Sequence, residues 1–458
     1  MATLATPGQI GRTHWRAVLD AMSKTGGVAL LSGLFSLLVV KVFAVTLGPG
    51  PVAQWGSLQQ LRQVGLTAAT LGGQTALIQG ASALSGRERE EFLRATALLM
   101  AIATVAVAGL LSLAPGWVAE RVGLTETETN MVRWMGPVIG LGAFGVYLTG
   151  LLTAERAIGT LALVQITGPV TAATMALPVA LLGGSGQTMW LVGLLGASAA
   201  ITFAVAAGPF FPHLRHDFFR GSWWNASAAR RFLTITGSLL ASSLFAHAVM
   251  VVARSRVLKT EGLEVGGQFD AAWAISMSQT GVVLASLQSF YLPSLASERT
   301  STDRAAHIER VLTLACLMAA AGITGIAALK PLFLKTLYSP AFFGAARFLR
   351  WTLAGDYLKV SSWILSIPFL ATGNIRTFLI GDVVAYGTFG VAAWGLAGSM
   401  GAAEASAVAF VLMYAVHLLF YGVRLWGSGE FRPTTRVMAT WTAGAAAVTI
   451  SSILFWNQ

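Results

Sequence analysis

The sequence holds little charge and a single cysteine. Of its 458 residues, 11% are charged and 55% are apolar. One cysteine, Cys316, excludes an internal disulfide, and its apolar surroundings predict a buried, unreactive thiol. A soluble chain of this length needs far more polar surface than this composition supplies. We therefore predict a polytopic membrane protein, and the 50 glycines suit close packing between membrane helices.

The sequence also lacks the motifs of common enzymes and metal sites. Its six histidines show no metal-ligand spacing, and HExxH, GxSxG and a Walker phosphate loop are all absent. We predict a protein that is not an enzyme, with no catalytic residue, no metal and no cofactor. Without a nucleotide-binding site, transport would draw on an ion gradient, the membrane potential or the gradient of the substrate.

What the sequence has instead is a series of long apolar runs. A helix needs about 20 apolar residues to cross a bilayer, and by this measure we predict thirteen spans. They cover residues 26–48, 52–78, 92–113, 131–153, 157–182, 188–210, 232–254, 267–294, 308–329, 346–370, 377–398, 403–424 and 438–456. The first run is too long for a signal-peptide core, so we expect no cleaved leader.

The distribution of basic residues predicts the orientation. If the N-terminus is cytoplasmic, the inner loops carry eighteen lysines and arginines and the outer loops carry nine. This bias agrees with the positive-inside rule, and it explains most of the net charge of +11 without nucleic acid. Because the number of spans is odd, we expect the C-terminus outside.

The two halves of the chain show weak internal similarity. Three motifs recur in the same order, at offsets of 210, 214 and 217 residues: Ser32–Phe35 with Ser242–Phe245, Gly48 and Gln54-Trp55 with Gly262 and Gln268-Phe269, and Arg133-Trp134 with Arg350-Trp351. Each copy holds an even number of spans, so both copies enter the membrane in the same orientation. This predicts two similar halves related by an axis along the membrane normal.

These patterns together predict a fold class and a domain organisation. We expect an all-α membrane protein with about 12–13 transmembrane helices, arranged as two pseudo-symmetric six-helix bundles around a central cavity. The predicted parts are a cytoplasmic segment 1–25, a first bundle 26–210, a cytoplasmic linker 211–231, a second bundle 232–426 and an additional helix 438–456.

A polar stripe interrupts the second span. Arg62 lies near its middle, where insertion of an arginine costs roughly 2.5–3.5 kcal/mol. Gln59, Gln63 and Gln74 share one helix face beside it, because separations of 4 and 11 residues return to nearly the same angle. The stripe is expected to face protein or a water-filled cavity. Arg62 either caps backbone carbonyls or pairs with an acid as a buried structural residue, or it contacts an anionic substrate in a cavity. No acidic residue lies deep inside a span of the first half to serve as its partner.

Other charges lie inside or at the ends of spans. Asp356 and Lys359 are neighbours on one helix face, and they form either an ion pair or an ion-coupling aspartate beside a lysine that meets substrate. Lys41 either snorkels outward or points into the cavity of Arg62. Arg254 and Arg350, at the outer ends of their spans, are further candidate anion contacts on the side where the insertion rule disfavours them.

Two segments resemble a known family. "LGPGPVAQWGSLQQL" followed by "LGGQTALIQGASA" is similar to the N-terminal signature of Wzx-type polysaccharide flippases, of the multidrug/oligosaccharidyl-lipid/polysaccharide exporter superfamily. Residues 337–374 resemble O-antigen and enterobacterial-common-antigen translocases of that family. The resemblance covers residues 26–426, and the thirteenth span and the basic outer ends depart from it.

The resemblance implies a function. The expected cargo is an undecaprenyl-diphosphate-linked oligosaccharide repeat unit, such as O-antigen, moved from the inner to the outer leaflet of the bacterial inner membrane by alternating access. Arg62, Lys41 and Lys359 match the cationic cavity of such families. Expected partners are this lipid-linked oligosaccharide, the membrane lipids, a polysaccharide polymerase and a chain-length regulator, but no nucleic acid.

Three other functions are open alternatives. A flippase for a lipid II-type peptidoglycan precursor handles similar chemistry, although that family usually has fourteen spans. An ion-coupled multidrug exporter of the same superfamily would favour deep carboxylates for a cationic cargo. A membrane glycan polymerase or ligase, from a different class, would need a large outer loop, and the predicted outer loops are short.

Overall fold

The chain is almost entirely helical. The computed structural model describes residues 27–28, 31–155, 157–183, 189–210, 222–298 and 300–454, and all regular structure within these ranges is helical. Twelve of the thirteen predicted spans coincide with one helix or helix arm each, and the span 52–78 is divided between two of the helices. The helices are Leu31–Thr46, α2 (Pro49–Ala69) with α3 (Gln74–Ala83), α4 (Gly86–Leu113), α6 (Thr129–Ala154), α7 (Ile158–Gly183), α8 (Met189–Ala207), the two arms of α10 (Ala226–Ser297), α11 (Ser301–Ala328), α13 (Ala346–Ala371), α14 (Ile375–Met400), α15 (Ala402–Ser428) and α16 (Thr435–Leu454).

Shorter helices connect some of these elements. They are α5 (Pro115–Arg121), η1 (Glu126–Glu128), η2 (Gly208–Phe210), α12 (Lys330–Leu337) and η3 (Pro340–Ala345). Eight of the described helices are long and apolar enough to cross a membrane. The two polar helices α2 and α13 are not among the eight, and both are largely enclosed by their neighbours. This arrangement is expected where a polar span is shielded from lipid.

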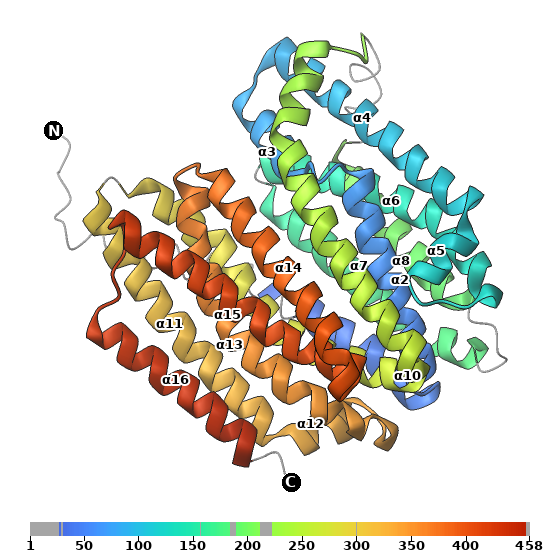
Figure 1. Ribbon diagram of the computed structural model, residues 1–458. Helices are drawn as coiled ribbons and strands as arrows, with labels where there is room; N and C mark the ends of the chain where they lie inside the picture. The colour runs from blue at the N-terminus through green and yellow to red at the C-terminus, as the bar shows by residue number, and fades with distance from the viewer. Residues whose placement is uncertain are drawn as a thin grey trace.

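The helices form two groups. In Figure 1 the blue-to-green helices of the first half and the orange-to-red helices of the second half converge near the α10 label and diverge toward α3. At the converging end, the long helix α10 packs against both α2 and α13. The predicted fold class of two pseudo-symmetric helix bundles is confirmed, whereas the domain boundaries stay a prediction.

Two glycines at matching positions of the internal similarity have the same backbone conformation. Gly48, before α2, has φ 84° and ψ −171°, and Gly262, which divides α10 into two antiparallel arms, has φ 83° and ψ 175°. This backbone conformation is open essentially only to glycine. The turns at these two glycines also lie together, since a Cβ on Gly267 would stand 2.2 Å from the carbonyl oxygen of Pro49. We call the end of the molecule formed by these turns the closed end.

Prolines inside helices create acceptors that neighbouring helices use. Pro169 in α7 cannot donate to the carbonyl of Gln165, and the Ser32 hydroxyl donates to that oxygen at 3.1 Å. Pro368 in α13 likewise cannot donate to the carbonyl of Ile364. This oxygen accepts a hydrogen bond from the Tyr291 hydroxyl at 3.3 Å instead. Free carbonyls are costly in lipid, so each of these hydroxyls stabilises a proline-containing helix.

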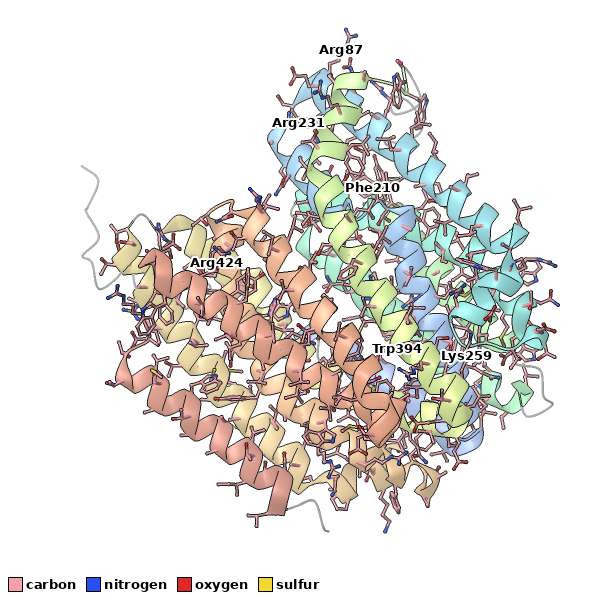
Figure 2. All side chains as sticks on the ribbon, in the orientation of Figure 1. Arg87, Phe210, Arg231, Lys259, Trp394 and Arg424 are labelled. Atoms are coloured by element: carbon pink, nitrogen blue, oxygen red, sulfur yellow. The ribbon has the colours of Figure 1, made fainter. Side chains whose placement is uncertain are left out.

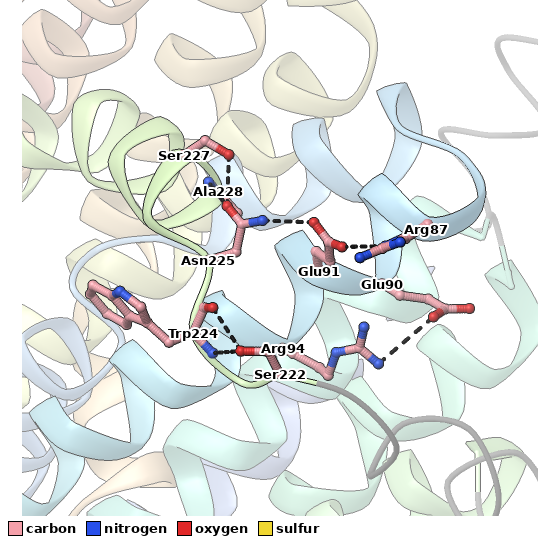
Figure 3. Close-up of polar contacts among 9 residues, drawn as sticks. All are labelled: Arg87, Glu90, Glu91, Arg94, Ser222, Trp224, Asn225, Ser227 and Ala228. Atoms are coloured by element: carbon pink, nitrogen blue, oxygen red, sulfur yellow. Dashed lines mark hydrogen bonds and ion pairs between the residues drawn. The ribbon is translucent and has the colours of Figure 1, made fainter.

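The start of α10 is anchored to α4 (Figure 3). Asn225 caps α10 by accepting from the Ala228 amide at 3.0 Å, and its side-chain amide donates to Glu91 in α4 at 2.6 Å. Residues 211–221 of the predicted linker lie outside the described residues. Because α10 begins at Ala226, the last part of the predicted linker is helical.

Candidate functional site

A central cavity of about 830 Å³ lies between helices of the first half and α10. The helix Leu31–Thr46, α2 and α3 line it on one side, and Ser243 and Met277 of α10 line it on the other. Its polar lining includes four residues predicted from the sequence: Gln59, Arg62, Gln63 and Gln74. The cavity reaches from the middle of α2 to Thr75, so it occupies the half of the molecule away from the closed end.

A second cavity, which we call the side chamber, lies within the first half. Its volume is about 410 Å³, and the helix Leu31–Thr46, α2, α6, α7 and α8 line it. It shares wall residues with the central cavity, among them Gln59 and Arg62. The Arg62 side chain therefore stands at the boundary between the two spaces.

Arg62 is the only charged residue among the described residues that line either cavity. No described residue forms an ion pair or a hydrogen bond with its guanidinium, and its buried Nε donates to nothing. The buried Oε1 of Gln59 also accepts no hydrogen bond from a described residue. Removing charge from water without a partner is unfavourable, so this cation is stabilised only when water or an anion enters the cavity.

The grouping of Gln74 with Gln59 and Gln63 has a different cause from the one predicted. The predicted span 52–78 is not one helix, because α2 ends at Ala69 with Leu71 at φ 54° and Gly72 at φ 59°. The Gly72 amide donates back to Thr67 at 2.8 Å, which is a Schellman-type end. Gln74 then starts α3, and this break brings it to the cavity. Lys41 lies on the helix Leu31–Thr46 but lines neither cavity.

The predicted pair in α13 is buried without an ion pair. Asp356 is fully buried, and neither carboxylate oxygen accepts a hydrogen bond from the described residues. Lys359 directs its ammonium to the sulfur of Met277 at 3.3 Å instead, and it lies 5.9 and 5.8 Å from the ring centres of Phe410 and Tyr414. Because Met277 lines the central cavity, one thioether separates Lys359 from that space.

Hydrogen bonds from the Arg254 side chain connect the two halves at the closed end. Its Nε and Nη2 donate to Asp270 at 2.9 and 2.5 Å, across the two arms of α10. Its Nη1 donates to the Ser57 hydroxyl and its Nη2 to the Ala53 carbonyl of α2, both at 2.6 Å. In this conformation each side-chain nitrogen of Arg254 has an acceptor within the fold, and its role as a candidate anion contact stays a prediction.

Glycine makes this contact possible. A Cβ on Gly56 would stand 2.3 Å from Asp270 Oδ2 and 2.6 Å from Arg254 Nη2. By the offset of 214 residues, Gly56 is the counterpart of Asp270. One half thus supplies the carboxylate, and the other half supplies the space for it.

Arg350 is also paired. Its Nη2 lies 2.5 Å from Glu404 Oε1, and the Trp351 indole donates to the same oxygen at 3.1 Å. A further pair that the sequence did not suggest is His417 with Asp382, at 3.4 Å between α15 and α14. Among the described residues, no group of three or more histidines, cysteines and acids is placed to hold a metal.

Figure 2 shows basic residues toward both ends of the molecule. Arg87, Arg231 and Arg424 lie toward the diverging end, and Lys259 lies at the closed end. The predicted orientation makes the diverging end cytoplasmic. That orientation stays a prediction.

Comparison with solved structures shows the fold. No protein-family model matches the sequence, and no curated protein matches it. The chain is similar to a structure of the lipid II flippase MurJ in an inward closed conformation, with a TM-score of 0.74 and 14% identity over 94% of this chain and 97% of that chain.

It is also similar to the inward-facing and outward-facing conformations of a multidrug resistance MATE family transporter of the MOP superfamily. The TM-scores are 0.71 and 0.67 at 14% identity, over 87% and 92% of this chain and 96% of each of those chains. The chain therefore has the fold of these membrane proteins. The finer resemblance to Wzx-type flippases stays a prediction.

Proposed function

We propose that this protein is a flippase for polyprenyl-diphosphate-linked oligosaccharides, which it moves from the inner to the outer leaflet of a bacterial inner membrane. Arg62 is the observation that carries the proposal. Among the described residues it is the one cation at the boundary of the two cavities, and none of the others neutralises it.

The charge of the cavity suits an anionic cargo. A diphosphate carries negative charge that must cross a low-dielectric region, where an unpaired ion is very costly. The planar guanidinium of Arg62 matches phosphate oxygens and can bind two at once. Gln59, Gln63 and Gln74 add hydrogen-bonding groups for sugars along the same wall.

The same lining argues against a cationic cargo. No acidic residue is among the described residues that line the central cavity or the side chamber. A drug cation that entered would meet the positive charge of Arg62 with no carboxylate to offset it. A multidrug exporter is therefore the weaker candidate, although MATE transporters share the fold.

The conformation agrees with a transport cycle. The cavity reaches the diverging end, while Arg254 and Ser57 hold the closed end together. Opening the closed end and closing the other would expose the cavity to the opposite leaflet, with the lipid tail left in the bilayer. In the predicted orientation, the present conformation accepts cargo from the cytoplasmic leaflet.

The proposal is tested with purified protein in liposomes that contain a fluorescent undecaprenyl-diphosphate-linked oligosaccharide. We expect Arg62→Ala to reduce flipping at least tenfold, because losing a buried charged contact costs about 2–5 kcal/mol. Arg62→Lys should retain part of the rate, since the charge stays and the fork is lost. Arg87→Ala is the matched control, because that side chain is 89% exposed.

The alternatives give different results in the same liposomes. Faster transport of lipid II than of the oligosaccharide lipid would identify a peptidoglycan-precursor flippase. Efflux of a cationic dye without flipping of either lipid would support a drug exporter. Wild-type flipping by Arg62→Ala would remove Arg62 from the mechanism.

A further inference from the structure

We infer that the side chamber is a saccharide subsite, which holds the sugar attached directly to the diphosphate while Arg62 holds the phosphate. This inference rests on the proposed function and adds the place and chemistry of sugar recognition. It assigns a role to a cavity inside the first half rather than between the halves.

Neutral polar groups and apolar side chains together line the chamber. Hydroxyls and amides come from several helices: Ser36, Gln59, Thr149, Gln165, Ser198 and Thr202. Apart from Arg62, none of its described lining residues is charged. Its volume of about 410 Å³ lies within the range of small-molecule sites, roughly 300–1,000 Å³.

Three of the lining hydroxyls present acceptors rather than donors to this space. Ser36 donates to the Ser32 carbonyl at 2.8 Å, Thr149 to the Val146 carbonyl at 2.9 Å and Ser198 to the Gly168 carbonyl at 3.0 Å. A hydroxyl that has used its proton can only accept further hydrogen bonds. The unpartnered Oε1 of Gln59 adds another buried acceptor.

The chamber thus combines hydroxyl acceptors, glutamine amides that both donate and accept, and apolar walls, which suit the hydroxyl groups and C–H faces of a sugar. A sugar offers several O–H groups, whereas a phosphate offers only acceptors and would leave these oxygens unsatisfied. The phosphate is therefore expected in the central cavity, on the other side of Arg62. In a glycosyl diphosphate the first sugar is bonded directly to a phosphate oxygen, so one ligand satisfies both sides of this residue.

Gly145 provides a way to fill the chamber. It is buried in α6 and lines the chamber, yet a Cβ built on it would meet no atom within 4 Å. A larger side chain at this position would extend into open space. Gly109 in α4 also has nothing within 4 Å of a built Cβ, but it does not line the chamber.

The test measures binding of two lipids to detergent-solubilised protein. The probes are undecaprenyl diphosphate bearing the oligosaccharide and undecaprenyl diphosphate without sugar. We expect the wild type to bind the glycosylated lipid at least tenfold more tightly. Gly145→Leu should remove this preference and leave the affinity for the bare diphosphate unchanged, whereas Arg62→Ala should weaken both. Gly109→Leu is the control, with wild-type affinities for both lipids.

Gln59→Leu is a second variant that removes an acceptor without filling the space, and melting curves establish that each variant is folded. The inference is overturned if the folded chamber variants keep the full preference for the glycosylated lipid. It is also overturned if the wild type binds both lipids equally. Absence of binding to either lipid would instead contradict the proposed function.

Discussion

At the scale of single residues, the buried charges of this protein differ in what neutralises them. Arg254 uses Nε, Nη1 and Nη2 on acceptors within the fold. Among the described residues, the Lys359 ammonium contacts the sulfur of Met277 and lies over the rings of Phe410 and Tyr414. The Arg62 side chain forms no hydrogen bond or ion pair with a described residue, and it lines both cavities. A charge satisfied internally stabilises one conformation, whereas an unsatisfied charge at a cavity is available to a ligand.

Asp356 offers a test of the two roles that its sequence position suggested. Asp356→Asn keeps the shape and removes the charge. Because neither carboxylate oxygen is hydrogen-bonded and Lys359 is directed elsewhere, we expect a melting temperature equal to or above that of the wild type. If Asp356 couples transport to protons, flipping by this variant should no longer respond to an imposed pH gradient.

Lys359→Met is the companion variant for this measurement. Both variants are assayed for melting temperature and for flipping with and without the gradient. A marked fall in the melting temperature of Asp356→Asn would show that the carboxylate is a structural partner of Lys359. An unaltered response to the pH gradient would exclude Asp356 from coupling.

The sequence identified some of these residues and not others, for physical reasons. Arg62 could be identified because an arginine near the middle of a span is costly to insert, and no acidic residue lies near it in sequence. The hydrogen-bond partners of Arg254 could not be predicted from the sequence. Asp270 lies beyond a glycine turn, and the other acceptors come from α2. The pairing of Arg350 could not be predicted either, because its partner Glu404 lies on another helix.

At the scale of elements, the local sequence of α2 determines its polar face, whereas its end and its contact with α10 depend on backbone conformation and tertiary contacts. The sequence predicted its polar face but not its end, since Leu71 must adopt a left-handed conformation to form the cap before Gly72. Side-chain periodicity does not reveal such a break in a long apolar run, although the Gly72-Gly73 pair was a signal for it. Near the closed end, Gly56 lets α2 approach the charged network of α10.

Gly56→Ala should weaken this helix contact. The added methyl group would stand within 2.6 Å of both Arg254 Nη2 and Asp270 Oδ2, so it displaces a charged hydrogen-bond network. We expect the closed end to lose about 1.5–3 kcal/mol, the usual worth of a hydrogen bond to a charged group. Melting of the purified protein followed by intrinsic fluorescence measures the loss.

Two further variants make the result specific. Gly109→Ala adds a methyl group where a Cβ meets nothing, so it should melt like the wild type. Ser57→Ala removes the acceptor of Arg254 Nη1 and should lower the melting temperature in the same direction as Gly56→Ala. A Gly56→Ala protein that melts with the wild type would show that α2 and α10 move apart without penalty.

At the scale of the whole molecule, the sequence predicted the fold class and not the conformation. Apolar runs and short repeated motifs were enough to predict two similar helical halves, because lipid demands helices and each half reuses one pattern. Which end is closed depends on contacts between the halves, such as Pro49 with Gly267. Such contacts join residues far apart in the chain, and no local pattern encodes them.

A disulfide across the closed end tests whether this end opens during transport. A Cβ on Gly50 would lie 4.0 Å from the Cβ of Leu263, within the usual range of about 3.5–4.5 Å for a disulfide. The two residues belong to the paired glycine turns of the two halves. The cysteine pair Gly50→Cys and Leu263→Cys is built in a Cys316→Ser background, which removes the native thiol.

Oxidation of this pair should reduce flipping of the lipid-linked oligosaccharide at least tenfold, because the cavity then opens only toward the diverging end. Reduction with a dithiol should restore the rate. Binding of the substrate should survive oxidation, since Arg62 and the side chamber lie on the cavity that stays accessible. Each single-cysteine variant controls for the effect of the oxidant. Unchanged flipping by the cross-linked protein would mean that cargo crosses without separation of these turns, and alternating access through the closed end would have to be abandoned.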